Sequence, residues 1–127
     1  MKALTIVTIL ALTLPVVAAN PSHLERLKKT NSCVGCDLSR ANLSSFNLAG
    51  ANLRRANLSG AVMQYMYEMR NAVFDGANLN YANLKDSAFG WGSFVGASLV
   101  GINLDFGQKR ELFRQQLMRS MFEFDGL

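Results

Sequence analysis

A five-residue period is the feature of this sequence that most constrains its fold. In the stretch DLSRANLSSFNLAGANLRRANLSG (37–60), a leucine stands at every fifth position. One face of a strand repeats every two residues and one face of a helix every 3.6, so a period of five fits neither. The pattern therefore excludes both an ordinary amphipathic helix and a simple alternating strand over this stretch.

The apolar residue that recurs in each five-residue unit is called its hub here. The period fails once, because residue 68 is glutamate and one residue is inserted near Met66. The fourteen hubs are Leu38, Leu43, Leu48, Leu53, Leu58, Met63, Met69, Phe74, Leu79, Leu84, Phe89, Phe94, Leu99 and Leu104. The position two residues before the hub is alanine in eight of the fourteen units, and asparagine often lies between the two. The unit is therefore A-N-L-x-x.

This unit resembles the motif of the pentapeptide repeat family, A(D/N)LXX. The resemblance covers residues 36–106. It implies an all-β solenoid, a right-handed quadrilateral β-helix in which each unit forms one side of a square. On that fold the chain turns a corner every five residues, and the hub and the small position both point inward. Fourteen units give about 3.5 coils, which at ~4.8 Å per coil make a rod roughly 17 Å tall.

The register makes specific predictions about stacking. Residues four units apart are expected to lie one above the other, so Leu53, Phe74 and Phe94 form one column of hubs. The two large residues at the small position, Phe46 and Tyr67, are also four units apart and are expected to stack. The recurrent asparagines suit the corners, where their side chains can bind backbone groups.

The N-terminal flank of the repeat predicts a short helical cap and linker over residues 20–35. Ser22 is the expected N-cap of the helix, and Glu25 completes a capping box. Leu24 and Leu27 would lie over the first coil, whose raw edge needs a cover.

The C-terminal flank, residues 107–127, predicts a capping helix followed by a tail. Its apolar residues at helical spacing are Leu112, Phe113, Leu117 and Met121. Because four basic residues accompany them, the segment 107–122 can instead bind a partner or make weak contact with a membrane surface. An edge left uncovered would also permit an end-to-end dimer.

Residues 1–19 predict a signal peptide cleaved near Ala19. A basic start at Lys2 is followed by an apolar run and by small residues at the expected cleavage site. A membrane anchor is the alternative, but the run of about 15 residues is shorter than the roughly 20 needed to span a bilayer. The chain is therefore expected to be exported. The resemblance adds the periplasm or the thylakoid lumen as compartments in which such proteins occur, beside secretion.

Cys33 and Cys36 are the only cysteines. In an exported protein an even count favours a disulfide, which would join the linker to the first coil. A redox-active dithiol is a second interpretation of the CxxC spacing, although no βαβ pattern surrounds it. A metal site is a third, but only His23 is available to complete a ligand set, so no metal is predicted.

Four outward positions form a candidate binding surface: Tyr65 and Phe106 fall on one side of the square, and Arg70 and Trp91 share another. Interfaces use exposed aromatic residues with arginine, although scattered exposed aromatics are also common on protein surfaces. The sequence does not distinguish these interpretations.

Charge argues against nucleic acid as a partner. The whole chain carries +4, but the repeat holds five basic and five acidic residues. A nucleic-acid binder would show a basic stripe. The best-known members of the family mimic DNA and protect gyrase, and this neutral, short repeat departs from them.

No catalytic motif or cofactor-binding motif is present in the sequence. We therefore expect a non-enzymatic scaffold or protein-interaction module with a protein partner of unidentified kind. A thiol redox protein and a peripheral membrane protein are the alternatives.

Overall fold

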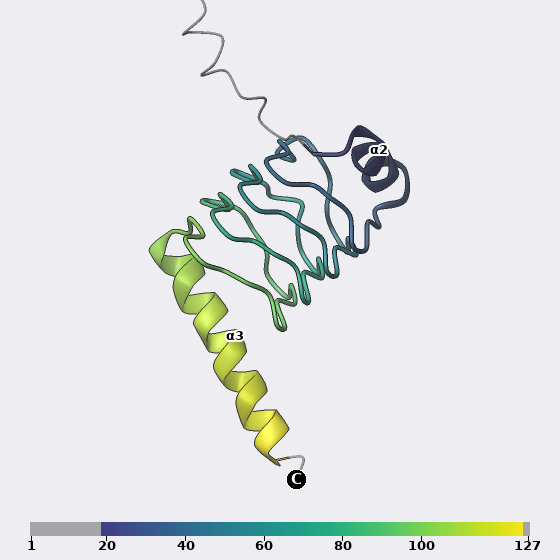
Figure 1. Ribbon diagram of the computed structural model, residues 1–127. Coiled ribbons are helices and arrows are strands. Elements are labelled where there is room, and N and C mark those ends of the chain that lie inside the picture. Colours follow the sequence, from purple (N-terminus) through teal and green to yellow (C-terminus); the bar gives the residue numbers. More distant parts are fainter. Residues whose placement is uncertain (1–18, 126–127) are drawn as a thin grey trace, which may run out of the picture.

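The computed structural model describes residues 19–125 and the side chains of residues 19–115. The predicted signal peptide lies outside this range except for its last residue, and so do the side chains of Leu117 and Met121. Helix α2 spans Pro21–Thr30 and helix α3 spans Phe106–Asp125. The repeat winds between them as a stack of coils, with α2 at one end and α3 at the other (Figure 1).

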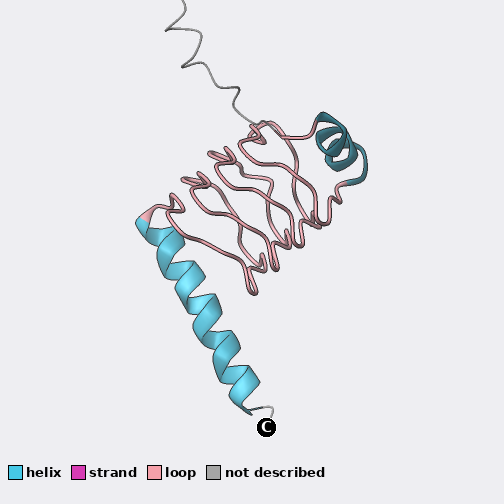
Figure 2. Ribbon diagram, in the orientation of Figure 1, coloured by secondary structure: helices cyan, strands magenta, loops and turns pink. Residues whose placement is uncertain are grey.

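Each coil returns to its starting position after four five-residue units. Parallel β-bridges join residues 20 apart, such as Asp37 with Asn57 and Val73 with Ser93. Backbone hydrogen bonds follow the same step, since the Leu38 N–H donates to the Asn57 carbonyl at 2.8 Å. The bridges are isolated and form no continuous strand in the described chain, so Figure 2 draws the coils as loops. A side cannot extend further because a turn follows each hub.

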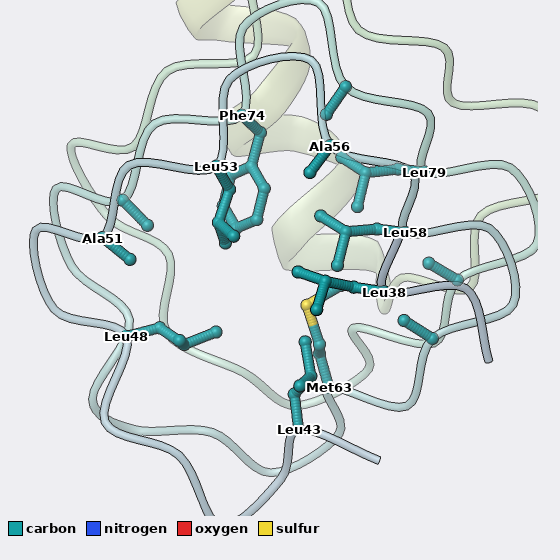
Figure 3. Close-up of a cluster of buried hydrophobic side chains, with 14 of the residues drawn as sticks. Leu38, Leu43, Leu48, Ala51, Leu53, Ala56, Leu58, Met63, Phe74 and Leu79 are labelled. Atoms are coloured by element: carbon teal, nitrogen blue, oxygen red, sulfur yellow. The ribbon is translucent and has the colours of Figure 1, made fainter. Parts of the chain in front are cut away.

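The hub side chains fill the centre of the coils, pointing inward from four sides (Figure 3). Thirteen of the fourteen hubs are buried, and Leu99 is half-buried because the last coil has a neighbouring coil on one face only. The predicted column of Leu53, Phe74 and Phe94 is confirmed in its aromatic part, where the rings of Phe74 and Phe94 stack with centroids 5.0 Å apart.

Asparagine side chains support the turns in the predicted way. The Asn57 Oδ1 accepts the backbone N–H of Ser59 at 3.1 Å, and the Asn78 Oδ1 accepts that of Asn80 at 2.9 Å. The same pairing recurs along the repeat. A short amide reaches the N–H two residues ahead without competing for the hydrogen bonds between coils. This explains why the residue before the hub is so often asparagine.

The residue two positions after a hub, called the corner residue here, has a left-handed backbone in most units. At Gly101 this conformation coincides with a close approach, because a Cβ atom there would lie 2.5 Å from the ring of Tyr81 on the preceding coil. Gly96 has the same φ of +67°, but a Cβ atom there would have no neighbour within 4 Å.

Gly101→Ala is therefore expected to destabilise the protein more than Gly96→Ala. Both variants carry a left-handed alanine, at a cost of about 1–2 kcal/mol, and only Gly101→Ala adds overlap with Tyr81, for about 1 kcal/mol or more. Urea unfolding measures the difference, which should disappear when Tyr81→Ala is combined with both variants. Equal stabilities of the two single variants would contradict the packing of Tyr81 on Gly101.

The structure corrects the assignment of the inserted residue. Met66, not Tyr67, occupies the small position, because Met66 is buried and its carbonyl accepts the N–H of Ala88, whereas Tyr67 is 71% exposed. Glu68 then holds the position before the hub, since its carbonyl accepts the Leu48 N–H. Tyr67 is thus the extra residue. The predicted stacking of Phe46 on Tyr67 is wrong, because the insertion turns Tyr67 out of the coil.

Helix α2 begins one step earlier than predicted. Its N-cap is Asn20, whose Oδ1 accepts the Ser22 N–H at 3.0 Å. Ser22 donates its hydroxyl to the same oxygen, so the predicted role of Ser22 as N-cap of a capping box is wrong. Pro21 explains the shift, since its fixed φ and missing N–H suit the first helical position. Leu27 is buried against the first coil and Leu24 is half-buried there, as predicted.

Helix α3 contacts the last coil through its first turns. Leu112 is buried as predicted, but Phe113 is 67% exposed, so its predicted place in the apolar contact is wrong. Gln108 takes part instead: its Nε2 donates to the carbonyls of Leu84 and Ser87, each at 2.7 Å. Coil carbonyls otherwise accept hydrogen bonds from the next coil, and Gln108 replaces that partner. The C-terminal end of α3 lies away from the coils (Figure 1).

Candidate functional site

Cys33 is a hub, which the sequence assignment of residues 20–35 as cap and linker missed. Its side chain is fully buried, its N–H donates to the Asn52 carbonyl at 2.8 Å, and Gly35 follows it as a left-handed corner residue. The bridge between Ser32 and Asn52 continues the 20-residue step. The first coil therefore starts one unit earlier than predicted. The spacing of five residues between Cys33 and Leu38 was the available signal.

A disulfide joins Cys33 to Cys36, with an S–S distance of 1.97 Å. It connects a hub to the small position of the next unit, so both sulfur atoms lie inside the first coil. Helix α2 covers this end of the core with Leu27, and each cysteine is at most 1% exposed. The Arg26 Nη1 lies 3.7 Å from the Cys36 Sγ, and the His23 carbonyl oxygen lies 3.3 Å from the Cys33 Sγ.

Polar contacts attach α2 to the residue that follows the disulfide. The His23 Nδ1 accepts the Asp37 N–H at 2.9 Å, and the Asn20 N–H donates to the Asp37 carbonyl at 3.1 Å. The hydroxyl and the N–H of Ser39 both donate to the Asp37 carboxylate and hold its pKa below the ordinary value. His23 therefore contacts the first coil and has no role that requires a metal.

The four predicted surface residues border one side of the rod, made by residues 66–70 and 87–90. Tyr65 and Trp91 are left-handed corner residues at its two edges, and Arg70 lies on the side itself. Phe106 starts α3 where the next coil would continue this side. The three aromatic side chains are 57%, 82% and 77% exposed, respectively. They form no ring stack with one another among the described residues.

Sequence reasoning did not place Tyr67 on this surface, although the insertion indicated an irregularity there. Tyr67 projects from the same side. In the other coils, the residue before the hub donates its N–H to the small position of the preceding coil, but Phe46 receives no such bond in this part of the structure. Ala88 and Gly90 keep the middle of the side low between its aromatic edges. This side, with Tyr65, Tyr67, Trp91 and Phe106 around it, is called the aromatic-edged side.

Within residues 19–125, no three His, Cys, Asp or Glu side chains gather as a metal site. Neither α2 nor α3, the helices in the described part of the chain, has the length and apolar content to cross a membrane.

Eight copies of the family model described as pentapeptide repeats match residues 34–66 and 68–90. The chain belongs to the pentapeptide repeat family. Tyr67 is the one residue between the matched ranges, which agrees with its place outside the five-residue register. The pentapeptide pattern continues past the match, since Phe94 and Leu104 remain buried hubs.

Among solved structures, the chain is similar to a pentapeptide repeat protein, Rfr23, from the cyanobacterium Cyanothece 51142. The identity is 22%, the alignment covers 67% of this chain and 95% of the other, and the TM-score is 0.36. No curated protein matches the chain. Pentapeptide repeat proteins form right-handed β-helices, and the stacked coils of this chain belong to that architecture.

Proposed function

We propose that this pentapeptide repeat protein is an exported, non-enzymatic scaffold that binds a protein partner. In this proposal the rod consists of about 3.5 quadrilateral coils at the spacing of paired strands, and α2 and the first turns of α3 cap its ends. A solenoid with covered ends presents its sides as rigid surfaces, which suits binding rather than catalysis. The near balance of charge in the repeat favours a protein over a nucleic acid as the partner.

The observation that carries the proposal is the aromatic-edged side. Trp91 is 82% exposed, and Tyr65, Tyr67 and Phe106 are exposed around the same side. Large aromatic side chains held on a rigid backbone lose little conformational freedom on binding and dominate protein interfaces, often together with arginine. Arg70 supplies that cation here.

Export is the second part of the proposal. The signal-like residues 1–19 and a disulfide in the first coil both suit an oxidising compartment such as the periplasm or the thylakoid lumen. Burial of both sulfur atoms beneath α2 argues for a structural bond rather than a catalytic dithiol, because catalytic cysteines are partly exposed.

Peripheral membrane binding is the second candidate function. Phe106 and Phe113 are seven residues apart on one face of α3, with Lys109 and Arg110 between them, and all four are exposed. Such a face suits the surface of an anionic bilayer.

One experiment separates the two functions. A photoreactive phenylalanine analogue at position 91 is expected to cross-link a protein in the compartment where the chain resides. The same analogue at position 81 is the matched control, because Tyr81 is also an aromatic corner residue and is 70% exposed, but on a different corner. Mass spectrometry of the adducts gives the result.

Equal or absent cross-linking at the two positions would contradict binding through the aromatic-edged side. If the purified protein then sediments with vesicles of anionic phospholipid, and Phe113→Ala abolishes that binding, the membrane function replaces the scaffold function.

A further inference from the structure

The Cys33–Cys36 disulfide cannot meet a reductant while α2 is in place. Both cysteines are at most 1% exposed, and Leu27, itself 1% exposed, lies over the same end of the core. Thiol–disulfide exchange requires a thiolate to reach one of the two sulfur atoms. Access therefore requires α2 to move away from the first coil.

We infer that α2 gates this disulfide as a redox-sensitive latch: a dithiol can reduce the bond only after α2 lifts, and reduction then weakens the attachment of the helix. The inference concerns the N-terminal end of the rod and does not rest on the proposed binding function.

Arg26 gives the exchange a direction. A thiolate of the dithiol attacks the Cys33 Sγ, the S–S bond breaks, and the Cys36 thiolate leaves. The Arg26 guanidinium, 3.7 Å from the Cys36 Sγ in the closed state, stabilises this thiolate. The second thiol of the reductant then attacks its own sulfur in the mixed disulfide and releases Cys33. Two electrons and two protons pass from the dithiol, which becomes a disulfide, to the cysteine pair.

The same contacts couple the bond to the helix. Asp37 follows Cys36 directly, and its backbone N–H and carbonyl bind His23 and Asn20 of the α2 region. The disulfide fixes the turn that presents these two groups. Without the bond the turn gains conformational freedom, so α2 loses ordered partners.

Reduction kinetics with dithiothreitol test the gate. The rate constant for the wild-type protein is expected to level off at high dithiothreitol, because lifting of α2 becomes limiting. Leu27→Ala removes the buried contact and should raise the rate at low dithiothreitol by about tenfold or more. Lys28→Ala, on the exposed face of the same helix, should leave it unchanged. A wild-type rate that equals that of the urea-unfolded chain, or no change in Leu27→Ala, would overturn the gate.

A second pair of variants keeps the inference testable if Leu27→Ala fails to fold. In a buffer of reduced and oxidised dithiothreitol, Arg26→Gln should shift the equilibrium severalfold toward the disulfide, and Arg26→Lys should restore it. Amide hydrogen exchange of the reduced protein should show lost protection in α2 and retained protection at Leu58 and Leu79. Equal protection of α2 in both redox states, or two free thiols in protein purified without reductant, would refute the latch.

Discussion

Replacing Phe74 with alanine lowers the free energy of unfolding by about 3–5 kcal/mol. Phe74 is fully buried and stacks on Phe94, with the ring centroids 5.0 Å apart. Coils lie above and below it, and their hydrogen bonds fix the spacing, since the Leu53 N–H binds the Val73 carbonyl and the Phe74 N–H binds the Ser93 carbonyl. The surrounding structure therefore cannot close around the cavity, which places the cost near the top of the range for such substitutions.

Phe113→Ala is the matched control for Phe74→Ala. It removes the same atoms from a side chain that is 67% exposed, and its effect should stay within about 0.5 kcal/mol. Urea unfolding followed by circular dichroism measures both values. Similar losses for the two variants would mean that the hubs do not form the core.

Deleting Tyr67 leaves a folded protein, whereas deleting Tyr81 prevents folding of the chain beyond it. Both residues are tyrosines, 71% and 70% exposed. Loss of Tyr67 restores the uniform five-residue period, because this residue stands outside the register. Loss of Tyr81 shifts the later hubs, from Leu84 to Leu104, by one position and turns them away from the core. At 1.5–3 kcal/mol per apolar side chain, several misplaced hubs cost more than the whole stability of a small domain.

Circular dichroism and one-dimensional NMR compare the two deletions. Dispersed amide signals are expected for the Tyr67 deletion, with a stability within about 2 kcal/mol of the wild type. An unfolded Tyr67 deletion together with a folded Tyr81 deletion would show that the extra residue has been assigned to the wrong position.

The sequence was sufficient to predict the core, because every coil repeats the same local problem. An apolar residue five positions on meets the same surroundings, so Leu58 and Leu79 could be placed without coordinates. Cys33 was missed because a cysteine hub does not resemble leucine. Tyr67 was misplaced because counting locates an insertion only to within a few residues. Hydrogen bonds between coils were needed to choose among them.

The ends were harder to predict, because no repetition constrains them. The pattern predicted that Leu112 would be buried, and it could not predict that Gln108 would replace a coil as a hydrogen-bond partner of two carbonyls. For the candidate site, the cysteine pair followed from composition, but the position of Arg26 beside Cys36 depends on how α2 docks. The side bordered by Tyr65 and Trp91 emerged only when the register was known.

The most direct test of the coil register is NMR scalar coupling across hydrogen bonds. Couplings are expected from the Leu38 nitrogen to the Asn57 carbonyl carbon, 19 residues on, and from the Leu58 nitrogen to the Asn78 carbonyl carbon, 20 residues on. The change from 19 to 20 reports the extra residue between the two coils. Equal separations on both sides of Tyr67, or couplings only between residues close in sequence, would contradict a stack of four-unit coils with one inserted residue.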